Sequence, residues 1–361
     1  NIPLILIEQL DIYGYQFLIE RIQKLYQEDR ITLLGSAAYH PLLTKIPIKM
    51  AEEQIILNEF GLGYYLGFSK DFEGDPSIMI KDLNGFFAPE MALNEDIVNL
   101  LVGLGYKWVV CENDTPQNST ISQYKEEEFF IIRRDKFLSN MLAFKRDTDI
   151  KNIEGYLTDN DGKLSLIALD AETFGHHFNE GIYMLEKILD SLREKGSYFL
   201  DIDSIIANTV IDNVKDFEET TWAQREGTNL YPLWTEDEKG LQKKLKSIEE
   251  DLCRSVSYGN FVSNDEDLYT LPFWKSEALK KVEDPKIGES VYVFVLLHKF
   301  LHSDKYWWLS NRKILDARII DYEMVKRSLK YVDILLEYVK ESEKEPIGKK
   351  VAEFRHILDI E

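Results

Sequence analysis

The chain has 361 residues, and its 43 lysines and arginines against 64 aspartates and glutamates give a formal net charge of −21 at pH 7. This negative charge repels nucleic acids and anionic membrane surfaces, so we expect neither as a partner, whereas a neutral sugar is unaffected. The sequence contains no apolar run of about 18 residues, which argues against a membrane-spanning helix. The length is sufficient for one large domain and a smaller one.

The two cysteines, Cys111 and Cys253, form neither a disulfide framework nor the spacing of zinc ligands. We therefore expect a reduced, cytoplasmic protein. The sequence also lacks a Walker or dinucleotide-binding glycine pattern and a CxxC motif, and we expect no cofactor and no metal. The sequence opens at Asn1 inside a strand-like run, without an initiator methionine. We interpret it as a processed or partial chain, whose targeting segment, if there is one, lies upstream.

The first two hundred residues alternate between amphipathic helical segments and short apolar runs that are typical of strands. This alternation predicts a parallel sheet with helices, either open or closed into a barrel. In chain order we expect a strand-like opening, a helix at 14–29, a strand at 30–41, helix and loop at 44–68, a helix at 94–106, a strand at 107–114, a strand and then a helix within 126–144, a strand at 163–178, a helix at 180–196 and a strand at 197–206.

The pattern changes after about residue 215, where helical periodicity dominates and strand signals are few. We expect residues 1–215 to form an α/β barrel domain and residues 216–361 a mainly helical domain that contributes to the cleft. The block at 337–350 is interpreted as a solvated helix end followed by a turn. The helical segments are expected at 238–256, 276–285, 291–302 and 318–344.

Four chemically capable side chains follow directly on apolar runs: His40, Glu90, Glu112 and Asp170. In (β/α) barrels the active site lies at the carboxyl ends of the strands. These positions therefore predict a site built from several separate segments.

Each acidic candidate also has a structural interpretation. Glu90 follows Pro89 shortly before a helix, where proline in the first turn and an acid near the helix dipole are common. Asp170 and Glu172 are two residues apart, so they point the same way on a strand, or they hold a turn as an acid pair. The adjacent pair of His176 and His177 lacks a third nearby ligand, so we do not expect a metal site there.

For the remaining candidates, spacing alone does not decide between a structural and a functional role. His40 precedes a proline, as a structural turn histidine does. His298 and His302 are four residues apart but lack the glutamate of a zincin motif, which favours packing over metal binding. Trp307, close to Asp304, suits a platform for a sugar ring, and it suits an aromatic core contact as well.

Glu90 and Asp170 remain as two carboxylates at different strand ends, with aromatic residues and histidines nearby. Cleavage of a glycosidic bond needs one carboxylate that attacks the sugar or activates water and a second that protonates the leaving oxygen. The apolar run before Asp170 is expected to raise the pKa of its carboxyl group, which suits the acid.

Three segments then resemble conserved regions of glycoside hydrolase family 57: GSAAYHPLLTKIP (35–47), GFFAPEMALNEDIVNLL (85–101) and LDAETFGHHFNEG (169–181). The segments at 105–114, 217–234 and 300–311 are similar to the family as well. The resemblance covers most of residues 1 to about 312. It implies an incomplete (β/α)7-type barrel followed by a mainly helical domain, and retaining chemistry on α-glucans or maltooligosaccharides.

The resemblance implies that Glu90 is the nucleophile, Asp170 the general acid/base and His40 a contact of the donor sugar. It further implies that the following residues line the cleft: Glu172, His176, Trp222, Asp304 and Trp307. The family's first region, His-x-His-Gln-Pro, is absent from the sequence, so we expect the barrel to lack its first strand.

Two classes of function follow from these observations. The first is a hydrolase or glucanotransferase of the amylase, disproportionating or branching type. The second is a catalytically impaired carbohydrate-binding protein of the same fold, for which the missing first region is the main argument. A metal-dependent polysaccharide deacetylase is disfavoured, because the sequence lacks an early Asp-Asp with a His-x-x-x-His context.

Overall fold

The structure is a computed structural model that divides into two compact units, residues Asn1–Tyr106 with Thr221–Glu361 and residues Lys107–Thr220. The division predicted at residue 215 stays a prediction. The residues that the structure describes are 1–66, 83–112, 120–144, 152–153, 155–156, 164–194, 196, 200–208, 211–223, 226–236, 239–257, 285–310, 313–314, 317–318 and 320–360.

The first unit begins with a helix, α1 (Leu4–Ile12), so the strand-like interpretation of the opening residues is wrong. The helix forms because Leu4 and Ile7, three residues apart, are both fully buried on one face. The predicted helices that follow are confirmed: α2 (Gln16–Gln27), α3 (Ile48–Leu66) and α5 (Glu95–Gly103).

The strand predicted at 30–41 is also wrong, because only Gly35 forms a bridge, with Phe86 of β1 (Gly85–Phe87). A Cβ atom on Gly35 would overlap the buried ring and hydroxyl oxygen of Tyr106, so this close approach favours glycine. The segment packs against a neighbouring side chain here instead of extending a strand ladder.

Tyr106 also contacts a buried acid, because its hydroxyl donates a hydrogen bond to Glu59 of α3. Glu59 is 2% exposed. Burial raises the pKa of Glu59 to about 8, although the hydrogen bond from Tyr106 acts in the opposite direction. The Glu59 carboxyl group is therefore largely protonated at neutral pH.

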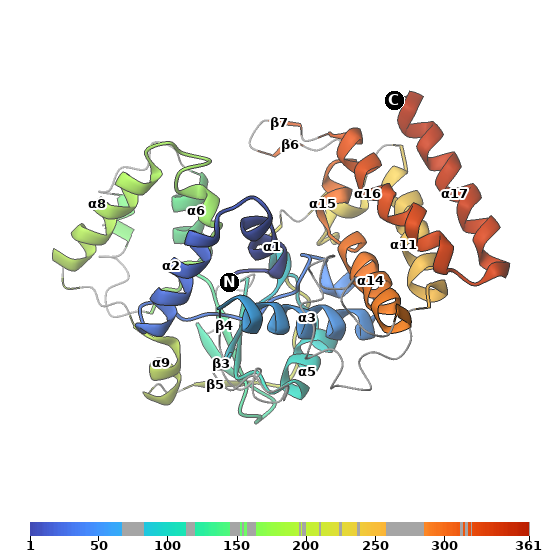
Figure 1. Ribbon diagram of the computed structural model, residues 1–361. Coiled ribbons are helices and arrows are strands. Elements are labelled where there is room, and N and C mark those ends of the chain that lie inside the picture. The colour runs from blue at the N-terminus through green and yellow to red at the C-terminus, as the bar shows by residue number, and fades with distance from the viewer. Residues whose placement is uncertain are drawn as a thin grey trace. The chain divides into compact units, whose positions relative to one another are not determined.

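The remainder of the first unit is mainly helical, as predicted. Its longer helices α11, α14, α16 and α17 lie side by side (Figure 1) and share one apolar core. Their bounds, with those of the shorter elements, are α10 (Pro232–Thr235), α11 (Leu241–Ser255), α14 (Pro285–Phe300), α15 (Asp304–Trp307), β6 (Lys313–Ile314), β7 (Ala317–Arg318), α16 (Tyr322–Leu335), η5 (Leu336–Tyr338) and α17 (Glu341–Ile360).

Within 337–350 the predicted helix end is present, since η5 ends at Tyr338 and residues 339–340 are not helical, but α17 then begins at Glu341 and continues through Pro346. The helix is favoured because a stripe of buried apolar residues recurs along it, at Ile347, Val351, Phe354 and Leu358. The helix predicted at 276–285 lies outside the described residues, apart from Pro285.

Among the described residues of the second unit, the strands follow the order β2-β4-β3-β5. The pairs β2–β4 and β3–β5 are parallel, but β3–β4 is antiparallel, so the prediction of a purely parallel sheet is wrong. A short connection, in which Lys125 and Glu126 both have positive φ, joins β3 to β4 as a hairpin. The bounds are β2 (Trp108–Cys111), β3 (Ile121–Tyr124), β4 (Phe130–Arg133) and β5 (Asp212–Val214).

Helices α6 (Lys136–Phe144) and α8 (Gly181–Glu194) of this unit are confirmed, and Leu138, Met141, Ile188 and Leu192 form their common core. The strand predicted at 197–206 is wrong, because residues Ile202–Asn208 form helix α9. The strand predicted at 163–178 is also wrong, since the described residues 164–178 contain no strand.

Candidate active site

Glu90 lies shortly after β1, in the one-turn 3-10 helix η2 (Pro89–Met91). Its side chain is buried, with 6% exposed. Helix α5 begins five residues later, where Asn94 caps it by accepting a hydrogen bond from the Ile97 backbone, and its first turn contains two acids of its own. Glu90 is therefore not the acid of a helix start, which was the alternative interpretation of the Pro-Glu pair.

The backbone at Glu90 is strained. Glu90 has a φ of 58° and Met91 a φ of 46°, so two successive residues other than glycine adopt the left-handed region. Such a conformation costs about 1–3 kcal/mol per residue and persists only where surrounding contacts determine it.

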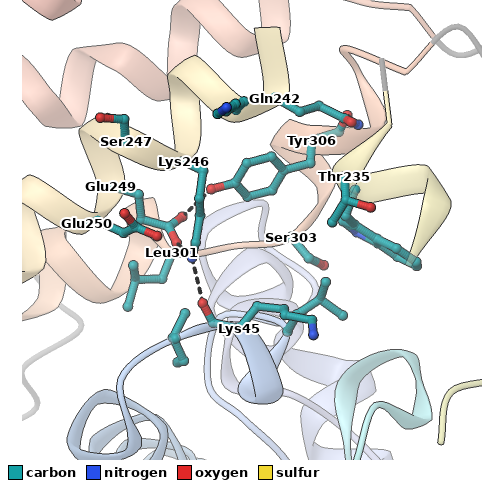
Figure 2. Close-up of a pocket in the computed structure, with 14 residues that line it drawn as sticks. Lys45, Thr235, Gln242, Lys246, Ser247, Glu249, Glu250, Leu301, Ser303 and Tyr306 are labelled. Carbon is teal, nitrogen blue, oxygen red and sulfur yellow. Dashed lines mark hydrogen bonds and ion pairs between the residues drawn. The ribbon is translucent and has the colours of Figure 1, made fainter. Parts of the chain in front are cut away.

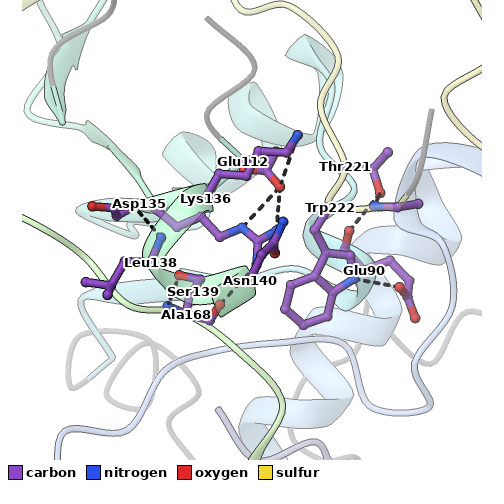
Figure 3. A network of polar contacts seen from close by, with 12 residues as sticks. Glu90, Glu112, Asp135, Lys136, Leu138, Ser139, Asn140, Ala168, Thr221 and Trp222 are labelled. Atoms are coloured by element: carbon purple, nitrogen blue, oxygen red, sulfur yellow. Dashed lines mark hydrogen bonds and ion pairs between the residues drawn. The ribbon is translucent and has the colours of Figure 1, made fainter. Parts of the chain in front are cut away.

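Those contacts come from Thr221 and Trp222, far along the chain but in the same unit. The Thr221 hydroxyl (2.8 Å) and the Trp222 amide (3.2 Å) both donate hydrogen bonds to the carbonyl oxygen of Glu90. The indole Nε1 of Trp222 donates to Oε2 of Glu90 at 2.7 Å (Figure 3). The Trp222 ring in turn meets Phe87 edge to face, with the centroids 5.6 Å apart. Both ends of Glu90 are thus fixed by the same two residues.

His40 lies beside the turn that leads into α15. It has a φ of 55°, its carbonyl oxygen accepts a hydrogen bond from the Ser303 amide (3.0 Å), and its Nδ1 lies 3.4 Å from Ser303 Oγ. Asp304, the next residue, is the first of α15. The structure therefore brings two of the predicted sugar-binding residues into one region of the first unit.

Trp307, at the end of α15, packs against Trp234 with ring centroids 5.5 Å apart. No described residue accepts a hydrogen bond from the indole nitrogen of either ring. This geometry fits the core contact that spacing left open.

Asp170 belongs to the second unit and is exposed. None of residues 164–169 before it is buried, so the apolar run does not place the carboxylate at the end of a buried strand. The segment before it is anchored by other contacts than a strand ladder (Figure 3). The Leu166 carbonyl accepts from the Asp135 amide (2.7 Å), and the Ala168 amide donates to Ser139 Oγ (3.1 Å).

Arg134 makes a third contact to this segment, and sequence reasoning missed it. Its Nη1 donates to the Ala168 carbonyl (3.1 Å), while its Nη2 lies 2.6 Å from Oε2 of the buried Glu112. Lys136 is 3.8 Å from the same oxygen. Glu112, predicted among the chemically capable strand-end residues, is therefore the anchor of an ion pair that supports the segment carrying Asp170. The only signal in the sequence was the adjacent pair of arginines at the end of β4.

Glu172 and His176 follow Asp170 around the turn η3 (Ala171–Thr173), and both side chains are exposed. The Glu172 carbonyl accepts hydrogen bonds from the amides of His176 (3.1 Å) and His177 (2.9 Å). Nε2 of His177 lies 3.9 Å from Oε2 of Glu172. Glu172 thus holds the turn through its backbone, while its side chain and that of His176 face solvent.

Two negative findings apply to the part of the chain that the structure describes. Within those ranges, no three His, Cys, Asp or Glu side chains gather into a group that could hold a metal ion. Among the described helices, none combines the length and the apolar composition needed to cross a bilayer.

Comparison with known proteins gives a family match. The model of glycosyl hydrolase family 57 matches residues 6–221. No curated protein matches the chain.

Solved structures of low sequence identity share the fold. The chain is 13% identical to a branching enzyme of Pyrococcus horikoshii, with a TM-score of 0.61 over 95% of this chain and 74% of that one. It is 15% identical to an exo-type maltose-forming amylase of Pyrococcus sp. ST04 (0.57; 88% and 64%) and to a 4-alpha-glucanotransferase of Thermococcus litoralis (0.52; 90% and 50%). These likenesses confirm the predicted fold class, an α/β protein with an incomplete (β/α)7-type barrel and a mainly helical C-terminal region.

Proposed function

The chain belongs to glycosyl hydrolase family 57, and we propose that it is a retaining hydrolase or glucanotransferase that acts on α-glucans. The structural relatives described above are a branching enzyme, an amylase and a glucanotransferase, which supports an α-glucan or maltooligosaccharide as substrate. The same two carboxylates serve both possible acceptors, which are water in hydrolysis and a second glucan in transfer.

In this proposal Glu90 attacks the anomeric carbon and forms a glycosyl-enzyme ester. The observation that carries the assignment is the fixation of Glu90 by Thr221 and Trp222, because a strained, buried carboxylate held at both ends is pre-positioned for attack. A carboxylate that served only to cap a helix would need neither the left-handed backbone nor the indole donor.

Asp170 would protonate the leaving oxygen and then accept a proton from water or from an acceptor hydroxyl. Its exposure supports proton exchange with solvent, and the anchoring of its segment by Arg134 and Ser139 supports a fixed position. Retaining chemistry predicts carboxyl groups about 5–5.5 Å apart in the working enzyme.

The sugar contacts of the cleft are proposed for the remaining predicted residues. His40 and Asp304, which share one region of the first unit, would bind hydroxyl groups, as would Glu172 and His176 of the second unit. Trp307 would offer an aromatic face to a ring. For Trp222, the bond to Glu90 supports a role in positioning the nucleophile in addition to the sugar contact. A cytoplasmic location is proposed from the cysteine content alone.

The experiment that tests the proposal is the measurement of turnover on maltoheptaose by Glu90→Gln and Asp170→Asn. Both variants should lose at least about three orders of magnitude in kcat, as general acid–base and nucleophilic groups do. The matched control is Asp96→Asn, an exposed acid six residues after Glu90, which should keep wild-type activity. Near wild-type turnover in either catalytic variant would refute the proposal. A wild-type protein that binds the oligosaccharide and yields no product would establish the carbohydrate-binding alternative.

A further inference from the structure

The segment that carries His40 leaves one side chain accessible. Residues 35–43 are all buried except His40, which is half-buried. His40 has a φ of 55° although it precedes Pro41, and a residue before proline ordinarily adopts an extended backbone with negative φ. A residue other than glycine keeps such a conformation only where its surroundings hold it, and such residues gather at functional sites. The contacts that hold this segment therefore decide where the imidazole lies.

The side chain of Gln54, on α3, connects this segment to a second helix. Its Oε1 accepts a hydrogen bond from the Tyr39 amide (3.0 Å), and its Nε2 donates to the carbonyl oxygen of His298 on α14 (2.9 Å). The backbone carbonyl of Gln54 accepts from the Ala38 amide (3.0 Å). Only one orientation of the side-chain amide fits, because a flipped amide would set donor against donor and acceptor against acceptor. The two residues before His40 are thus bound to one glutamine.

The elements that Gln54 joins are themselves fixed at this level. Glu53, the residue before it, lies with its Oε2 3.1 Å from Nε2 of His298, and both side chains are buried. The Tyr39 hydroxyl donates a hydrogen bond to Glu8 of α1 (3.2 Å). Gln54 therefore ties the segment to a junction in which α1, α3 and α14 are already joined by buried polar contacts.

Ser303, the residue before α15, binds the carbonyl side of the histidine. Its surroundings are fixed as well. Tyr306 of α15 donates to Glu249 of α11 (2.9 Å), and Lys246 of α11 donates to the Lys45 carbonyl oxygen (2.5 Å), so α15, α11 and the loop before α3 are joined around Ser303 (Figure 2). The backbone on both sides of the histidine is thus bound, which leaves the half-buried imidazole as the group that can meet a ligand.

The same segment pairs with the strand that leads to Glu90. Gly35 forms a parallel bridge with β1, and the Ser36 hydroxyl donates to the Phe87 carbonyl (2.8 Å). The two chains run in the same direction from this bridge, so His40 and Glu90 both follow the carboxyl end of β1, where the active sites of (β/α) barrels lie. A contact that fixes the segment therefore also fixes His40 relative to the nucleophile.

We propose that Gln54 is a positioning residue that holds His40 where it meets the sugar attacked by Glu90. The inference rests on the proposed function, in which His40 contacts the donor sugar. Gln54 has no exposed surface, so it does not touch the substrate itself. It acts by restricting His40 to one conformation before the substrate arrives, which lowers the entropy cost of ordering the site on binding.

The test is a double-mutant cycle between Gln54→Met and His40→Ala, with kcat and KM measured on maltoheptaose. Gln54→Met removes both side-chain hydrogen bonds and keeps an unbranched side chain of similar length. The matched control is Asn58→Leu, which removes another fully buried amide one turn further along α3, where Oδ1 of Asn58 accepts from the Leu4 amide (2.8 Å). Thermal melting of each variant reports its stability.

We expect Gln54→Met and His40→Ala each to lower kcat/KM about tenfold. The double variant should be no slower than His40→Ala, because Gln54 has nothing left to position once the imidazole is gone. Asn58→Leu should melt at a lower temperature, as Gln54→Met does, but keep the wild-type kcat/KM.

Four results overturn the positioning role alone: a folded Gln54→Met or an His40→Ala variant with wild-type kcat/KM, losses that multiply in the double variant, or an equal loss in Asn58→Leu. A wild-type protein that does not turn over maltoheptaose overturns the proposed function, and this inference with it. If Gln54→Met does not fold, Gln54→Asn replaces it in the same cycle, since its amide is one methylene too short to reach both Tyr39 and His298; the same results then overturn the role.

Discussion

The hydrogen bond from Trp222 to Glu90 makes a sharp test possible, because it can be removed without removing the aromatic ring. Trp222→Phe deletes the indole donor at 2.7 Å from Oε2, while the backbone amide of residue 222 and the Thr221 hydroxyl still bind the Glu90 carbonyl. The substitution also keeps an aromatic ring next to Phe87. Any effect on catalysis therefore reports on the carboxylate end of Glu90.

The expected magnitude follows from the charge of the acceptor. A hydrogen bond to an ionised group contributes about 1.5–3 kcal/mol, and each 1.36 kcal/mol is a factor of ten, so kcat/KM should fall roughly ten- to 150-fold. Two effects contribute and they are separable by pH. Loss of orientation lowers kcat at the plateau, whereas loss of the donor makes Glu90 harder to ionise and moves the acidic limb of the profile to higher pH, by about one pH unit.

The assay is the pH dependence of kcat and KM on maltoheptaose, read for reducing ends and for new α-1,6 links. Trp108→Phe is the matched control, since it removes another indole–carboxylate bond, to Asp203 at 2.9 Å in the second unit. That variant should melt at a lower temperature but keep the wild-type acidic limb. If Trp222→Phe shows wild-type rates and a wild-type profile, the bond does not position Glu90 and the reasoning is refuted.

Two further predictions concern buried acids. Arg134→Met leaves Glu112 buried without its main partner and should lower the free energy of unfolding, measured by urea denaturation, by about 3–5 kcal/mol. Lys136→Met removes the more exposed partner and should lower it by less than about 1 kcal/mol. Equal effects of the two variants would contradict this ranking. Glu59 has a folded-state pKa of about 8, above its unfolded value, so its contribution to stability is complete below about pH 4.5 and is lost as the pH rises through 8. The free energy of unfolding of Glu59→Gln should therefore decline less between pH 5 and pH 9 than that of the wild type. If the two pH dependences are parallel, the raised pKa of Glu59 is refuted.

The helices were the predictable part of the fold, because the residues that they bury recur in the sequence with the helical period. Long amphipathic segments such as α11 and α16 expose one face and bury the other, and the sequence alone reveals this. The opening helix α1 was missed because a short apolar run fits a strand and a buried helix equally well. The prediction of a strand before Asp170 was wrong for a different reason. The side chains of Ser139 and Arg134 bind the backbone of this segment, and no local sequence pattern indicates such contacts.

The candidate site was predictable in its residue types but not in its construction. Glu90 could be selected from its place after an apolar run and from its family resemblance. The left-handed backbone at Glu90 and Met91 has no signal in the sequence, because neither residue favours that conformation. The sequence predicts for Trp222 only a contact with the sugar, because its position in the chain does not indicate that its indole nitrogen lies next to Glu90.

The origin of the groups that hold Glu90 limits how the enzyme can be divided. A fragment of residues 1–215, the barrel as the sequence delimits it, would include Glu90 and Asp170 but not Thr221 or Trp222. Such a fragment would lose the hydrogen bonds that Thr221 and Trp222 donate to the carbonyl and the carboxylate of Glu90. Grafting or shortening this protein at its apparent domain boundary would thus yield a scaffold with both acids and no working geometry.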